Sequence, residues 1–378
     1  MDPNALPFDV DTMLAGLRRW VETESPTFDV AAVNRMMDVA ADDHARAGFS
    51  VERIPGPPGL GDCLRADLPH PRQGEPGILL MSHLDTVHPI GTLSKLPFRR
   101  DGGRCYGPAI LDMKGGAFTA LEAAIQLSRA GIETPLPVSV LLTSDEEIGS
   151  PGTRDLIEAE ARRHKYILVP EPGRPDNQGV VTGRYAIARF NLEAEGRPSH
   201  AGVALKDGRS AISAMARHIL AIEAMTDEDC TFSVGVIEGG RWVNCVPTTC
   251  RAEALSMAKR QADLDRGVER MLALSTQGAD GTRFTVTRGV TRPVWEPDAG
   301  TMHLYEVALG VASDIGIDLP HQSAGGGSDA NFTGAAGIPS LDGLGLLGTG
   351  YHTLDEHIEV ESLVQRGRLM AGLLHRLT

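Results

Sequence analysis

At 378 residues the chain exceeds the usual size of one hydrophobic core, so we expect two domains. Its content of 42% hydrophobic and 23% charged residues is typical of a globular protein, and its formal net charge of -14 argues against nucleic acid or an anionic membrane as a partner. It has no apolar run of about 18 residues. The N-terminal residues lack the basic and then apolar pattern of a secretory signal, so we expect a cytoplasmic protein.

The predicted elements of the first half alternate between helices and strands. Residues 9–48 are expected to form one or two amphipathic helices. Apolar strands follow at 77–81, 138–142 and 166–170, with a long helix at 113–131 between the first two. This alternation predicts an α/β domain with a mostly parallel sheet and helices on both of its faces.

The order of elements changes at about residue 184. The pattern there predicts an α+β unit of the βαββαβ, ferredoxin-like type. Its expected elements are a strand at 185–195, a helix at 208–225, strands at 231–238 and 249–257, a helix at 260–275 and a strand at 282–289. We therefore expect an inserted domain, 184–291, that separates two parts of the first domain, 1–183 and 292–378.

Polar residues follow each predicted strand of the first domain, at the sheet edge where open α/β sheets place their sites. His83 and Asp85 follow the first strand. In an extended chain they point to the same side, so Asp85 can accept a hydrogen bond from His83 and leave the other ring nitrogen free for a metal. A satisfied core histidine beside a solvated acid explains the pair equally well.

Four further carboxylates have ordinary explanations when each is taken alone. Asp112 precedes the long helix and could be its N-cap. Glu146 and Glu147 follow the second strand, and Glu171 lies in a Pro-flanked turn after the third. Acids on turns are usually solvated.

Two histidines, His352 and His357, lie in a Gly-rich loop before a predicted final helix at 361–377. Histidine and carboxylate ligands without cysteine suit catalytic zinc, manganese or cobalt, and the five scattered cysteines show no CxxC spacing. More acids than one metal needs predict two divalent metals, about 3.5–4 Å apart and bridged by one acid. One of the paired glutamates would then be a ligand, and the other the general base for a water molecule between the metals.

Seven motifs, in order from about residue 75 to the C-terminus, resemble a known family. They are "SHLDTV", "GPAILDMKGG", "TSDEEIGS", "PEP", "GRPSHAG", "GGGSDA" and "GYHTLDE". The family is that of the dinuclear zinc metallopeptidases of aminoacylase, glutamate carboxypeptidase, acetylornithine deacetylase and succinyl-diaminopimelate desuccinylase type. The resemblance implies two ligand sets that share Asp112 as the bridge: His83, Asp112 and Glu171 on one metal, and Asp112, Glu147 and His352 on the other.

The resemblance also assigns residues that do not bind metal. It implies that Glu146 is the catalytic acid/base and that Asp85 orients His83. In the inserted domain, which resembles the family's lid, His200 would stabilise the oxyanion, in its own or in a partner's site. Substrate contacts are implied for Asn244 and for the loop of Gly326, Gly327 and Ser328. Because such lids usually dimerise, we expect a homodimer. The alternatives are an exposed turn residue for His200, a turn cap for Asn244 and a flexible connector for the glycine-rich loop.

The chain departs from the family pattern on one lid strand. Many relatives carry Asp-x-Arg there, and the arginine binds the substrate carboxylate, whereas this chain has Leu255-Ser256-Met257. A methionine offers apolar contact to substrate in place of bidentate recognition. A free carboxylate on the substrate is therefore in question.

The main hypothesis is hydrolysis of the C–N bond of a small N-acyl amino acid or peptide. Hydrolytic deamination, or amide cleavage, of another small and possibly aromatic molecule is the alternative. A TIM-barrel amidohydrolase would have an early HxH pair, where this chain has HxD. A binding protein on the same fold would have lost a ligand or the base, yet all are present.

Overall fold

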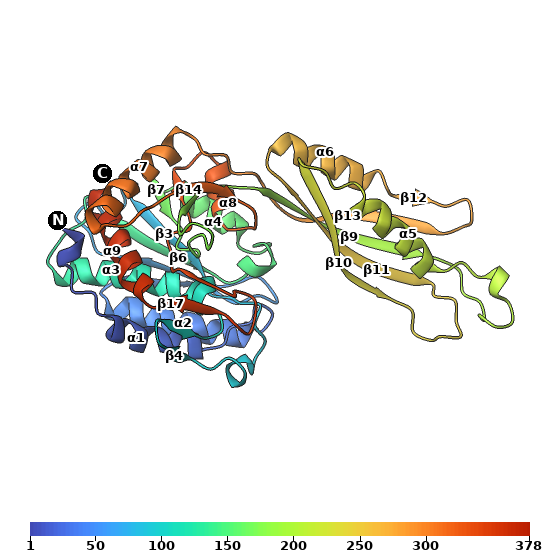
Figure 1. Ribbon diagram of the computed structural model, residues 1–378, viewed down its shortest axis with the longest axis horizontal. Coiled ribbons are helices and arrows are strands. Elements are labelled where there is room, and N and C mark those ends of the chain that lie inside the picture. The colour runs from blue at the N-terminus through green and yellow to red at the C-terminus, as the bar shows by residue number, and fades with distance from the viewer. The chain divides into compact units, whose positions relative to one another are not determined.

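The computed structural model describes all of residues 1–378, and the chain divides into two units (Figure 1). The first unit comprises Met1–Gly183, Glu296–Ala324 and Ser328–Thr378. The second comprises Arg184–Trp295 and Gly325–Gly327. None of the helices combines the length and the apolar character that crossing a lipid bilayer requires.

A six-stranded sheet forms the centre of the first unit. Its strands, in spatial order, are β1 (Ser50–Ile54), β2 (Cys63–Asp67), β6 (Val138–Thr143), β3 (Ile78–His83), β7 (Tyr166–Leu168) and β15 (Ser340–Leu341). Strand β3 pairs in parallel with both β6 and β7, and β15 pairs in parallel with β7. The predicted mostly parallel sheet is confirmed. The antiparallel strands β1 and β2 at one edge escaped prediction because both are short and mix charged with apolar residues.

The crossover helices explain why both faces of this sheet are covered. Helix α3 (Gly115–Arg129) connects β3 to β6, and α4 (Arg154–Ala161) connects β6 to β7. Because β6 and β7 flank β3, the two crossovers run in opposite directions, and right-handed connections then place α3 and α4 on opposite faces. The order also makes the end of β3 a topological switch point, where open α/β sheets bind ligands.

The other helices of the first unit lie with α3 or α4 on the two faces of the sheet. They are α1 (Val10–Glu22), α2 (Val30–Arg46), α7 (Ala299–Ile315), α8 (Ala330–Ala335) and α9 (Glu361–Arg376). Helix α3 packs against α1 and α9, and α9 packs against α7, whereas α4 packs against α8. The main apolar core lies between the sheet and helices α1, α2, α3, α7 and α9, with Trp20, Leu80 and Leu369 among its buried members.

Short elements make up the rest of the first unit. A two-stranded sheet pairs β14 (His321–Ala324) with β8 (Val180–Arg184), and a four-stranded sheet has the order β16 (Gly348–Thr349), β17 (His357–Glu359), β5 (Arg104–Tyr106) and β4 (Arg99–Asp101). Single helical turns lie at Pro3–Ala5, Thr92–Ser94, Ile110–Lys114 and Glu146–Ile148.

The second unit has an antiparallel five-stranded sheet with two helices on one face (Figure 1). Its strands are, in spatial order, β10 (Cys230–Gly239), β11 (Thr249–Ala258), β9 (Ala186–Glu195), β13 (Arg283–Arg292) and β12 (Thr276–Gln277). Its helices are α5 (Ala211–Glu223) and α6 (Gln261–Leu272), with a short turn at Leu205–Asp207. Alternate residues of β11, such as Ala252 and Ala254, are buried with the helices in a separate core. The predicted α+β unit of βαββαβ type is confirmed.

We expect one buried histidine to make the stability of the first unit depend on pH. His44 of α2 is 1% exposed and packs edge-on against Phe49, with ring centroids 5.3 Å apart. Its Nδ1 lies 2.8 Å from the carbonyl oxygen of Ala40. Burial lowers the pKa of His44 to about 4.

Between pH 6.5 and 4, the unfolded chain therefore binds a proton at His44 that the folded chain does not bind. As the pH is lowered from 6.5 to 4, the free energy of unfolding should therefore decrease, by about 3 kcal/mol for this group. The variant His44→Leu lacks the contribution, so the metal-free wild type should lose more stability than the variant in urea titrations from pH 7 to 4. An identical pH dependence of both proteins would contradict this assignment.

Candidate metal centre

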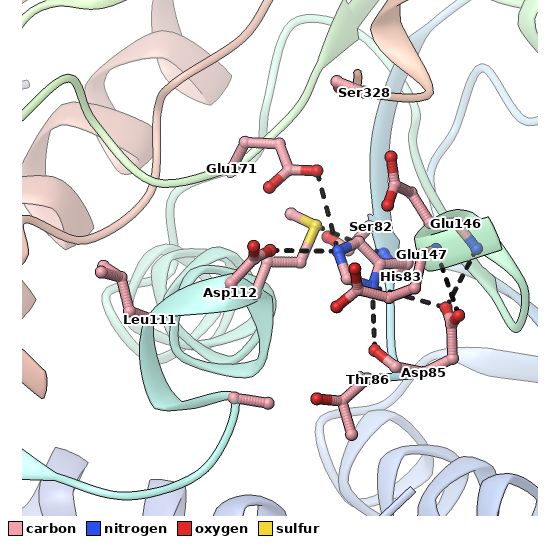
Figure 2. A network of polar contacts seen from close by, with 12 residues as sticks. Ser82, His83, Asp85, Thr86, Leu111, Asp112, Glu146, Glu147, Glu171 and Ser328 are labelled. Carbon is pink, nitrogen blue, oxygen red and sulfur yellow. Dashed lines mark hydrogen bonds and ion pairs between the residues drawn. The ribbon is translucent and has the colours of Figure 1, made fainter. Parts of the chain in front are cut away.

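Three neighbouring strand ends bring polar side chains to one edge of the first unit's sheet (Figure 2). Strand β3 ends at His83, the turn Glu146–Ile148 follows β6, and Glu171 follows β7. Parallel strands end at the same edge of a sheet, so these residues meet although they are far apart in sequence. His83 and Glu171 are shielded from water, with exposed fractions of 1% and 6%.

Asp112 lies at the centre of this cluster, in the turn that precedes α3. Its Oδ1 is 3.3 Å from His83 Nε2, and its Oδ2 is 3.2 Å from His352 Nε2. His83 Nε2 is also 3.8 Å from Glu171 Oε1, and His352 Nε2 is 3.2 Å from Glu147 Oε2. The cluster therefore consists of two sets of nitrogen and oxygen atoms that share Asp112.

The carboxylates of this cluster need positively charged partners to balance their negative charge. Burial lowers the pKa of His83, but hydrogen bonds to Asp112 and Asp85 outweigh it and raise this pKa well above its usual value. Hydrogen bonds to Asp112 and Glu147 raise the pKa of His352 to about 11. Burial and repulsion from Asp112 raise the pKa of Glu171. Metal ions bound here would take the place of protons on the two imidazoles.

The donor atoms fit a divalent metal of the catalytic kind. Ligand atoms of His83, Asp112 and Glu147 all lie within 4.8 Å of one another. Imidazole and carboxylate donors without a thiolate suit zinc, manganese or cobalt in a site that keeps a position open. The residues present can therefore hold the metal that sequence analysis predicts.

Asp85 contacts both His83 and the turn that carries Glu146 and Glu147. Its Oδ1 accepts a hydrogen bond from the Glu146 N–H at 3.1 Å, and its Oδ2 accepts one from the Glu147 N–H at 3.3 Å. His83 Nδ1 lies 3.0 Å from the backbone oxygen of Asp85 and 3.4 Å from Oδ1. Thr27 Oγ1 donates a hydrogen bond to Oδ2 at 2.8 Å, and no sequence pattern predicts this contact. Asp85 thus orients both the His83 ring and the turn that carries the glutamates.

The two glutamates of this turn are placed differently. The side chain of Glu147 is 5% exposed and faces His352. Glu146 is partly exposed, and Figure 2 shows its carboxylate apart from Asp112. Glu146 is still close enough to raise the pKa of His83. Glu147 can therefore bind a metal, while Glu146 stays off the metal and can contact a molecule bound in the site.

Asp145, the first acid of the "SDEE" sequence, does not join the cluster. Its carboxylate accepts hydrogen bonds from the Gly152 N–H at 2.6 Å and from Thr153 Oγ1. Burial raises the pKa of Asp145 to about 6. These hydrogen bonds explain why the Asp145 carboxylate is tolerated at the strand end. His357 is also elsewhere, with Nδ1 2.7 Å from the backbone oxygen of Asp355.

Two predicted residues lie in neighbouring loops of the second unit. His200 is exposed, and its Nδ1 accepts a hydrogen bond from the Gly202 N–H at 3.1 Å. Asn244 is exposed too, and its backbone oxygen accepts from the Ala201 N–H at 2.9 Å. The loops of His200 and Asn244 are therefore adjacent, and the roles of both residues stay predictions.

The other predicted substrate contacts occupy a strand and a loop. Met257 lies half-buried on the face of the second unit's sheet opposite the helices, whereas Ser256 is buried among the core residues. Gly326, with φ of 85°, and Gly327 belong to the same unit, and Arg184 Nη1 is 3.5 Å from the Gly327 oxygen. Ser328 is buried in the first unit, where its Oγ accepts from the Ala330 N–H.

Comparisons with known proteins match residues 79–376 to the family described as Peptidase family M20/M25/M40. The chain is 30% identical to carboxypeptidase G2 of Pseudomonas sp. (strain RS-16), over 95% of this chain and 87% of that protein. It is 28% identical to succinyl-diaminopimelate desuccinylase of Methylorubrum extorquens (strain PA1), over 85% and 88% respectively. The structure of aminopeptidase PepT from Bacillus cereus ATCC 10987 matches with a TM-score of 0.75 and 25% identity, over 97% of this chain and 98% of that one. These matches confirm the family resemblance.

The central place of Asp112 predicts the outcome of one substitution. In Asp112→Asn, an amide nitrogen replaces one of the two shared oxygens, so we expect the dialysed protein to lose at least half of its bound metal. Asp145→Asn is the matched control, because Asp145 is buried beside the site but faces away from it. Elemental analysis of both variants checks this. Equal metal loss in the two variants, or none in Asp112→Asn, would contradict the geometry.

Proposed function

Because this chain belongs to peptidase family M20/M25/M40, a family of metal-dependent hydrolases, we propose that it cleaves the amide C–N bond of a small N-acyl amino acid or peptide. The observation that carries the proposal is the sharing of Asp112 between His83 and His352. It supports two divalent metals, with zinc as the first candidate and manganese or cobalt as alternatives. His83, Asp112 and Glu171 would hold one metal, and Asp112, Glu147 and His352 the other.

The protein's own residues would divide the remaining work among them. When bound, the metals would polarise the scissile carbonyl and acidify a water molecule. Glu146, at the rim of the cluster, would take the proton of this water and then deliver it to the leaving amine. Asp85 would keep Glu146 in place through the hydrogen bond from its backbone N–H. His200 would donate a hydrogen bond to the oxyanion as negative charge develops there.

Two relatives, and one departure of this chain from the family pattern, support the proposed class of substrate. Carboxypeptidase G2 and succinyl-diaminopimelate desuccinylase support an amide next to a carboxylate. Leu255 and Met257 occupy the strand where many relatives place an arginine, which favours an apolar group at that point. A hydrolytic deaminase or amidase acting on an apolar or aromatic molecule is therefore the second candidate.

A product assay decides between these candidates. The zinc-, manganese- or cobalt-loaded protein is given N-acyl amino acids, dipeptides and aromatic amines, and the products are identified by mass spectrometry. The proposal expects release of an acid and an amine. Ammonia from an aromatic amine would support the second candidate, and no turnover of any substrate would support a binding protein on the same fold.

Glu146→Gln should remove activity while leaving the metal in place. Loss of a general acid/base lowers turnover by about 10²–10⁴-fold, and Glu146 is not among the proposed ligands. Glu158→Gln is the control, because Glu158 lies on α4 and pairs with Arg154. Turnover number and metal content are measured together. An unchanged turnover number in Glu146→Gln would remove this residue from its role.

We also propose that the protein forms a homodimer through the second unit. Strand β10 is an edge of the second unit's sheet, and Val236 and Ile237 on it are 46% and 52% exposed. Leu220 of α5 is 71% exposed. An apolar edge strand is open to pairing with another chain, and a second copy would cover it.

A charged side chain on the edge strand β10 should separate the two subunits. Light scattering should give the wild type twice the mass of one chain, and Ile237→Lys the mass of a single chain. Leu309→Lys is the control, because Leu309 is 44% exposed but lies on α7 of the first unit. A monomeric wild type would contradict the proposal.

A further inference from the structure

One buried carboxylate next to the metal centre has no part in the proposed chemistry. Glu356 is fully buried, four residues after His352. Its Oε1 accepts hydrogen bonds from the backbone N–H groups of Leu111 at 2.9 Å and Asp112 at 3.1 Å. Its Oε2 accepts a third, from the Ala109 N–H at 3.0 Å. Three backbone donors of one turn thus converge on a single side chain.

The same carboxylate binds a histidine from another segment. His88 Nε2 lies 2.7 Å from Glu356 Oε2, and His88 is buried. This histidine follows the ligand His83 by five residues, and its backbone N–H donates to Thr86 Oγ1 at 3.2 Å. Glu356 therefore connects the three segments that carry His83, Asp112 and His352.

The turn that carries Asp112 needs such support because it is not a regular helix. Ala109 has a φ of 55°, in the left-handed region that residues other than glycine rarely adopt. Asp112 has φ of -115° and ψ of 98°, outside the helical range. The backbone N–H groups of Ala109, Leu111 and Asp112 all need an acceptor, because buried N–H groups without one are costly. The carboxylate of Glu356 satisfies these groups.

We propose that Glu356 is a positioning residue that fixes Asp112 between His83 and His352 and thereby sets the affinity of the site for its metals. The inference rests on the proposed metal pair. A carboxylate that only stabilised the fold would affect unfolding and leave metal affinity unchanged. The two roles can therefore be separated by measuring metal binding in the folded protein.

The test is Glu356→Gln, which keeps the shape of the side chain but replaces one acceptor oxygen with an N–H₂ group that opposes the donors around it. Substitutions next to ligands typically lower metal affinity by about 10–100-fold. We expect at least a tenfold weaker affinity for Zn²⁺ in competition with a chelator, and an altered visible spectrum of the Co²⁺-loaded protein. Glu160→Gln is the matched control, because Glu160 is 2% exposed and pairs with Arg65 and Arg163 away from the site.

A second variant keeps the inference testable if Glu356→Gln does not fold. His88→Phe leaves the carboxylate and its three backbone hydrogen bonds intact, and should weaken Zn²⁺ binding by about threefold or more through loss of one donor. Wild-type affinity and an unchanged Co²⁺ spectrum in whichever of the two variants folds would overturn the role of Glu356. Failure of the wild type to bind Zn²⁺ would instead overturn the proposed function itself.

Discussion

Repulsion among buried acids is the constraint on which the site depends. Glu147 and Glu171 are almost entirely shielded from water and face the charge of Asp112, so each has a raised pKa. Burial raises the pKa of Asp112, but hydrogen bonds to His352 and His83 outweigh it and lower this pKa. A group of anions this close is stable only when protons or cations balance it. Divalent metals, as proposed here, would meet this need and would supply chemistry that protons cannot.

The sheet makes the convergence possible, and a surrounding set of hydrogen bonds makes it specific. Parallel strands β6, β3 and β7 end side by side, which places polar side chains from distant parts of the chain at one edge. Asp85 then fixes the His83 ring and the glutamate turn, and Glu356 fixes the turn of Asp112. Ligands held by buried partners lose little freedom when a metal binds, and this favours tight binding.

Sequence reasoning predicted the sheet and the side chains that meet at its edge because both follow local rules. Buried parallel strands appear as apolar runs, and polar residues after such runs indicate a site, as they do for His83 and Glu171. Thr27, His88 and Glu356 were missed because their contacts join positions 58 or 268 residues apart, and even the motif "GYHTLDE", which ends in Glu356, does not show what this acid contacts. Asp145 shows a further limit: adjacent acids in a tight turn point in different directions, and sequence spacing does not say which of them face the site.

The central claim is that Asp112 bridges two cations, and its most direct test is anomalous diffraction at the zinc edge from crystals grown with zinc. The account predicts two peaks about 3.5–4 Å apart. One peak should contact His83 and Glu171, the other Glu147 and His352, and both should contact Asp112. A map without peaks at this edge of the sheet, or with a single peak that does not touch Asp112, would contradict the account.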